Sequence, residues 1–158
     1  MRWVLLATFM ALPALCQGEQ ICPWMNAATA GGFLEGSVSS TVVHPKQNSD
    51  DATCEFVRQQ LPPAYTLRIE VETMTAPSEF SSFAARCGAS GTPLKAIGNE
   101  AFTCSKHEKA EQRIEEVVGR VRNRAFIIRL TTTDHSIAQA SLREKARNVA
   151  EQVAGILF

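Results

Sequence analysis

The sequence predicts an α+β domain: a mainly antiparallel sheet of about five to six strands, a C-terminal helix packed on one face, and two disulfides. Three observations lead to this prediction. The expected strands follow one another as hairpins, without the crossover helices that a parallel sheet requires. Residues 65–74 alternate apolar and polar side chains, which indicates a strand with one buried and one wet face. The end of the chain carries an apolar stripe at helical spacing.

The first half of the chain predicts a short helix and three strands. Asn26 is a typical N-cap for a helix over 27–34. The β-branched run 37–44 predicts a strand, and 53–60 predicts the strand that returns after a polar turn. The alternating segment 65–74 is the third strand.

The second half predicts two helices and three further strands. Phe80, Phe83, Ala84 and Cys87 have the spacing of one helical face, so this face should meet the sheet. A loop over 88–93 follows. The remaining expected elements are a short strand at 101–105, a charged loop at 106–112, a hairpin of 115–121 with 125–132, and a helix that begins near Gln139.

The N-terminus resembles an export signal. Arg2 precedes the apolar run 3–15 (WVLLATFMALPAL), which is too short to span a bilayer. We therefore expect a signal peptide at 1–18 and a single domain at 19–158; a buried N-terminal helix is the alternative. Cleavage fits two positions near Cys16, and a lipid anchor on Cys16 is a minor alternative because Leu15 is larger than the residue expected before a lipidated cysteine.

The chain has five cysteines, an odd number. If Cys16 leaves with the leader, Cys22, Cys54, Cys87 and Cys104 remain, and an even number in an exported chain predicts two disulfides. We favour Cys22–Cys54 and Cys87–Cys104, because each pair closes a loop between neighbouring elements and the loops do not interleave.

No metal or other cofactor is expected. The sequence contains no CxxC, HxH or HExxH motif, and its histidines (His44, His107 and His135) are scattered. The formal net charge is zero, so a nucleic-acid partner is not expected either. The partner should be an envelope protein or a small ligand.

Three arginines at alternate positions form the most conspicuous charged pattern. Alternation should place Arg120, Arg122 and Arg124 on one face of the hairpin, where they could bind an anionic partner. The alternative is cross-strand pairing with acidic side chains of the wet face. The acidic candidates for that pairing are Glu70, Glu72, Glu115 and Glu116.

Candidate catalytic groups are few. His107 beside Glu108 lies in the charged loop, and Asp134 beside His135 precedes the last helix, where Asp134 is expected to act as a cap. No set of nucleophile, base and orienting group is visible, so the chain is not expected to be an enzyme. A small envelope hydrolase that uses His107 or His135 is the alternative.

Aromatic side chains offer one further candidate site. Trp24, Phe33 and Tyr65 could line a ligand groove between the first helix and the sheet. Aromatic residues make up only 7% of the chain, so we assign these three to the core instead.

Three segments together resemble a family of exported bacterial lipoproteins and envelope proteins of unknown function. The segments are 22–36 (CPWMNAATAGGFLEG), 53–56 (TCEF) and 96–102 (AIGNEAF). The resemblance implies a compact α+β domain related to the fold of the photosystem accessory protein PsbP, a Cys22–Cys54 bridge and no known catalysis. No functional residue carries over from it.

These observations predict an exported, periplasmic or extracellular bacterial protein that acts as a non-catalytic binding or accessory module of the cell envelope. The alternatives are the small hydrolase and a secreted protein that binds anionic surfaces through Arg120, Arg122 and Arg124.

Overall fold

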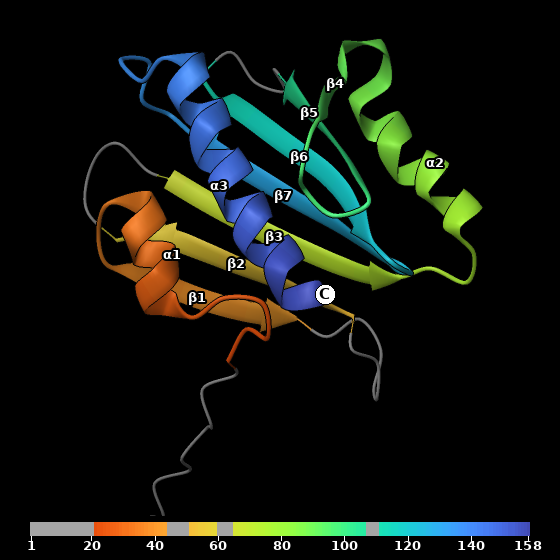
Figure 1. Ribbon diagram of the computed structural model, residues 1–158. Helices are drawn as coiled ribbons and strands as arrows, with labels where there is room; N and C mark the ends of the chain where they lie inside the picture. The colour runs from red at the N-terminus through yellow and green to blue at the C-terminus, as the bar shows by residue number, and fades with distance from the viewer. Residues whose placement is uncertain (1–20, 44–50, 60–64, 107–110) are drawn as a thin grey trace, which may run out of the picture.

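The computed structural model describes residues 21–43, 51–59, 65–106 and 111–158. They form an α+β domain around one antiparallel sheet of seven strands, in the order β1-β2-β3-β7-β6-β5-β4 (Figure 1). The strands are β1 (Val38–Val43), β2 (Ala52–Arg58), β3 (Tyr65–Thr73), β4 (Thr92–Leu94), β5 (Glu100–Lys106), β6 (Arg113–Val121) and β7 (Arg124–Thr132).

The sheet has one strand more than the upper end of the predicted five to six. The additional strand is β4, which falls largely within the predicted loop 88–93 and pairs with β5 at the edge of the sheet. Pro93 has no N–H to donate, and an edge strand tolerates this because one side of it needs no partner. A segment of three residues is too short to show the alternation by which the other strands were predicted.

Helices α1 (Ala27–Leu34) and α3 (Gln139–Leu157) cover one face of the sheet (Figure 1). The predicted cap is confirmed, since the Asn26 side chain accepts a hydrogen bond of 2.8 Å from the backbone N–H of Thr29. The predicted start and stripe of the last helix are also confirmed, with Leu142, Val149 and Val153 fully buried against the sheet. No helix among the described residues is long and apolar enough to cross a membrane.

Among the described residues, those that cover the opposite face lie near the β4 edge. The single predicted helix there is instead three short pieces: η1 (Pro77–Glu79), α2 (Phe80–Ala84) and η2 (Ala85–Ser90). The backbone of Gly88 leaves the helical region at φ 52°, which a glycine adopts without steric cost. Phe80 and Cys87 nevertheless both face the sheet, as their spacing predicts.

Both predicted disulfides are present. Cys22–Cys54 joins the segment before α1 to β2, with 5.8 Å between the Cα atoms, and Cys87–Cys104 joins η2 to β5, with 5.5 Å. The bridges lie in the two separate apolar clusters on opposite faces of the sheet. Two buried disulfides indicate an oxidising compartment. The expected leader 1–18 and the alternative anchor at Cys16 lie outside the described residues.

Candidate functional site

A hollow of about 500 Å³ opens between the end of α1, the facing ends of β2 and β3, and the start of α3. We call it the Tyr65 hollow. Its volume lies within the range of about 300–1,000 Å³ that small-molecule sites occupy. It is lined by Glu35, Arg58, Tyr65, Asp134, Ser136, Ile137, Ala138, Ser141 and Lys145.

Strand periodicity places Arg58 and Tyr65 in this hollow. Arg58 is the last residue of β2 and is in phase with the buried Cys54 and Phe56, so it points to the face that α1 and α3 cover. Tyr65 is the first residue of β3 and is in phase with its buried positions. The guanidinium carbon of Arg58 lies 5.8 Å from the centre of the Tyr65 ring, within cation–π distance.

Two polar groups of the hollow lack a hydrogen-bond partner among the described residues. The Nε atom of Arg58 is buried and donates to no acceptor there. Tyr65 is 2% exposed, yet no hydrogen bond joins its hydroxyl to the described part of the chain. Buried polar groups are normally satisfied, so the unpartnered Arg58 Nε is unusual for a position beside the core.

An ion pair closes the α1 side of the hollow. Lys145 of α3 donates to the Glu35 carboxylate at 2.5 Å and to the backbone carbonyl of Phe33 at 3.3 Å. Glu35 holds a left-handed backbone conformation with φ 58° at the end of α1. The hydrogen bond and the positive charge from Lys145 lower the pKa of Glu35, so this carboxylate is ionised at neutral pH.

Asp134 forms the rim on the β7 side. The prediction that it caps α3 is wrong. Its carboxylate accepts hydrogen bonds from the hydroxyl of Ser136 at 2.6 Å and from the backbone N–H of Ser136 at 2.8 Å. These bonds lower the pKa of Asp134. The N-cap residue of α3 is Ala138, which has no side-chain cap, because the helix begins too far along the chain for Asp134 to reach its first turn.

Tyr65 is a proton donor in this setting. Burial, followed by the negative charges of Glu35 and Asp134, raises its pKa, and the opposing effect of Arg58 is smaller. The hollow can therefore hold a polar ligand by a neutral phenol, two cations and the hydroxyls of its rim.

His135, the histidine that the described residues include, does not line this hollow. His135 is exposed, although its neighbours Asp134 and Ser136 line the cavity. His44, His107 and Glu108 lie outside the described residues. Within the described ranges, no group of three or more His, Cys, Asp or Glu side chains is placed to hold a metal ion.

The three alternating arginines do not share a face, contrary to the prediction. The chain reverses between β6 and β7, so Val121 is opposite Arg124 and Arg120 is opposite Ala125. Arg120 therefore lies on the α2 face, over the Phe80 ring, whereas Arg124 lies on the α3 face, 5.0 Å from the centre of the Trp24 ring. Arg122 occupies the turn.

Cross-strand pairing explains Arg120, but with a carboxylate other than those predicted. Arg120 donates through Nε to Glu100, which lies directly opposite on β5. The backbone N–H of Arg122, not its side chain, donates to the Asn99 side chain at 2.6 Å. A contiguous basic stripe on the hairpin is therefore not formed.

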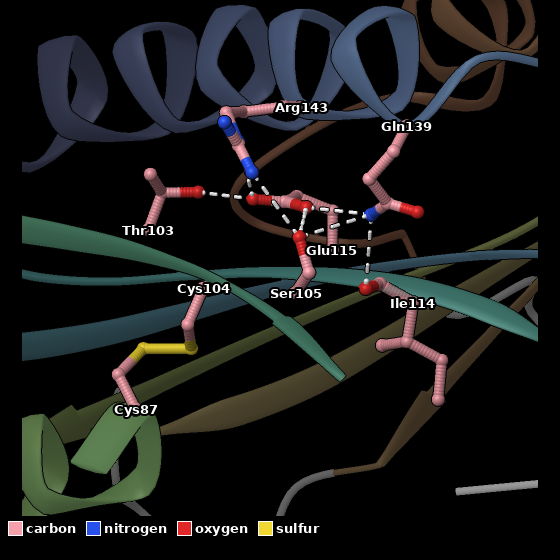
Figure 2. A network of polar contacts seen from close by, with 8 residues as sticks. All are labelled: Cys87, Thr103, Cys104, Ser105, Ile114, Glu115, Gln139 and Arg143. Carbon is pink, nitrogen blue, oxygen red and sulfur yellow. Dashed lines mark hydrogen bonds and ion pairs between the residues drawn. A yellow bond between two sulfur atoms is a disulfide. The ribbon is translucent and has the colours of Figure 1, made fainter. Parts of the chain in front are cut away.

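Two consecutive buried glutamates of β6 hold the covering helices to opposite faces of the sheet. Glu115 faces α3 and accepts hydrogen bonds from Thr103 (2.6 Å), Ser105 (2.7 Å), Gln139 (2.7 Å) and Arg143 (3.1 Å) (Figure 2). Figure 2 shows this network between α3 and the sheet, with Cys87–Cys104 on the other side. All four donors come from β5 or from the first turns of α3, which indicates a structural role.

Glu116 faces the α2 side and is surrounded by cations. Its carboxylate accepts from Lys106 at 2.7 Å and from Arg86 at 3.3 Å, and Nε of Arg129 lies 3.4 Å away. Burial opposes its ionisation, but the hydrogen bonds and charges of Lys106 and Arg86 outweigh burial, so the pKa of Glu116 lies below its usual value.

The aromatic candidates are part of the core, as predicted. Trp24 and Tyr65 are buried in the cluster under α1 and α3, and Phe33 packs against it. Tyr65 also lines the hollow, where sequence reasoning did not find its partners Arg58, Glu35 and Lys145. The signal that could have found them was Arg58 itself, a charged residue in phase with the buried positions of its strand.

No family model, curated protein or solved structure matches the chain. The resemblance to exported bacterial lipoproteins stays a prediction.

Proposed function

We propose that the protein is an exported, non-catalytic binding or accessory module of the bacterial cell envelope, and that it binds a small ligand in the Tyr65 hollow. The observation that carries the proposal is the buried Arg58 Nε, which has no acceptor among the described residues and lies in a hollow of ligand size. The two disulfides support export to the periplasm or the cell exterior.

The hollow has the features of a site prepared before binding. Its walls are set by strand ends and by α3, and rigid elements hold binding groups more accurately than loops do. A buried donor without an acceptor costs about 1–3 kcal/mol, and a ligand that supplies the acceptor recovers that free energy. We therefore assign binding to these groups.

The test is retention of a ligand by the purified protein. The full chain is exported from a bacterial host, incubated with envelope extract and examined by native mass spectrometry for a bound small molecule. A Ser141→Trp variant fills the mouth of the hollow from an exposed position of α3, and Arg147→Trp places the same side chain on α3 outside the hollow.

We expect a bound molecule in the unmodified protein and in Arg147→Trp, and its loss in Ser141→Trp. Retention by both variants would place the ligand elsewhere. Failure of the unmodified protein to retain any molecule would also contradict the proposal.

A further inference from the structure

We infer that the ligand of the Tyr65 hollow is a monoanionic carboxylate, held with its carboxylate against Arg58 and the start of α3. This inference rests on the proposed function and specifies the chemistry of its ligand. Three features of the hollow support it among the described residues: a cation without an ion pair, a helix start without a side-chain cap, and a tyrosine hydroxyl without a hydrogen-bond partner.

Arg58 is the cation of the hollow whose charge a ligand could neutralise. A guanidinium stays charged at every physiological pH, so it cannot lower the free-energy cost of its burial by losing a proton. Its Nε is buried without an acceptor, and no carboxylate of the described residues lies within ion-pair distance of it. The nearby carboxylate of Glu35 is already bonded to Lys145.

The start of α3 adds a second attraction for negative charge. The N-terminus of a helix carries a partial positive charge and backbone N–H groups without intrahelical acceptors. Ala138 cannot cap them with a side chain, and both Ala138 and Ser141 line the hollow. Tyr65 also lines the hollow, and its hydroxyl, which has no hydrogen-bond partner in the described part of the chain, is a third donor.

The charges around the hollow also limit the negative charge that a ligand can carry. Glu35 and Asp134 line it and are ionised at neutral pH, so they repel a ligand with two negative charges more than one with a single charge. A planar carboxylate fits the fork of a guanidinium, with two parallel hydrogen bonds. The remaining volume borders Ile137 and the Tyr65 ring, which suits an apolar body behind the carboxylate.

Three probes that share a phenyl ring separate these possibilities: benzoate, its neutral planar analogue benzamide, and phenyl phosphate, which is dianionic and tetrahedral. Each is titrated into the full exported protein, and binding is followed by changes in backbone amide NMR shifts. We expect saturable changes with benzoate that centre on Arg58, Tyr65 and Ser141, about tenfold weaker binding of benzamide, and phenyl phosphate weaker than benzoate.

Variants identify the groups that hold the carboxylate. Arg58→Gln should weaken benzoate binding about tenfold, Arg58→Lys less, and Tyr65→Phe about fivefold, because each removes a donor to the same group. Arg147→Gln, which removes an exposed arginine of α3 that pairs with Glu151, should leave binding unchanged. Thermal unfolding of each variant checks that it is folded.

Equal binding of benzamide, tighter binding of phenyl phosphate, or no effect of Arg58→Gln would each overturn the inference, as would the absence of a saturable response to benzoate. If benzoate fails while Ser141→Trp abolishes retention of a neutral molecule from extract, the inference falls and the proposed function stands.

Discussion

Two glycines of this chain differ in what surrounds them, and alanine should therefore act in opposite directions at the two positions. A Cβ on Gly119 of β6 would lie 2.3 Å from Cζ of Phe126, whose side chain is fully buried. The ring cannot move away without disturbing the core. We expect Gly119→Ala to lower the free energy of unfolding by about 2 kcal/mol, measured by urea denaturation.

Gly155 supplies the matched control. It lies in the last turn of α3, and a Cβ there would have no atom within 4 Å. Gly155→Ala should raise the free energy of unfolding by up to about 0.5–1 kcal/mol, because alanine loses less backbone entropy in a helix. If Gly119→Ala were neutral under the same conditions, the close packing of Phe126 on β6 would be wrong.

Glu116 makes part of the stability dependent on pH. Its pKa is lowered in the folded protein, so the unfolded chain binds more protons than the folded one in acid. The stabilisation is complete above the unfolded value of about 4.5 and is lost as the pH falls from there through the folded pKa. We expect the denaturation midpoint to fall over this range, measured between pH 7 and pH 3.

The Glu116→Gln variant tests the assignment. It should be less stable at pH 7, because Lys106 and Arg86 lose their acceptor charge, and its midpoint should change less with pH in the acid range. Glu151→Gln, which removes an exposed carboxylate of α3, controls for general effects of charge. An acid profile of Glu116→Gln identical to that of the unmodified protein would assign the dependence to other carboxylates.

At the scale of elements, Glu115 fixes the start of α3 to the sheet. Removing it in Glu115→Ala leaves the buried Thr103 hydroxyl without its acceptor and frees Gln139 and Arg143. We expect the free energy of unfolding to fall by about 2–3 kcal/mol. The loss is no larger because Arg143 is half-exposed and can turn to water. Hydrogen exchange should rise most in the first turns of α3; a uniform rise along the helix would contradict this local role.

The elements that sequence predicted well are those that carry a long, regular pattern. Tyr65–Thr73 alternates over its whole length, and the apolar stripe of α3 extends from Leu142 past Val153, so periodicity alone indicated both elements and their buried faces. The segment from Pro77 to Ser90 has the correct spacing of Phe80 and Cys87 but turns into 3₁₀ geometry, which preserves their direction without a continuous α-helix.

Prediction failed where the outcome depends on how elements meet. The alternation of Arg120 and Arg124 is real, yet a reversal of the chain between them places them on opposite faces. The Tyr65 hollow combines the ends of α1, β2 and β3 with the start of α3, and one sequence does not reveal such a meeting of distant segments. The local signals were Tyr65, which the sequence offered as a groove residue, and Arg58, which is charged and in phase with a buried face.

At the scale of the whole molecule, the two disulfides tie the covering layers to the two faces of one sheet. Cys22–Cys54 lies in the cluster under α1 and α3, and Cys87–Cys104 lies in the separate cluster under α2. Groups that share no contacts contribute independently to stability. Each bridge should therefore act on its own, at about 3–4 kcal/mol in the chain-entropy treatment of loops with sequence separations of 32 and 17.

This independence gives a prediction for the paired variants Cys22→Ala/Cys54→Ala and Cys87→Ala/Cys104→Ala. Each should lower the free energy of unfolding by about 3 kcal/mol, and the quadruple variant by about the sum, in urea denaturation without reductant. A typical domain has only about 5–15 kcal/mol in total, so the quadruple variant should be largely unfolded near 37 °C. A quadruple variant no less stable than either pair would show that the two faces of the sheet are coupled. If the two effects add as expected, each face of the single sheet needs its own disulfide, because neither bridge stabilises the layer on the other face.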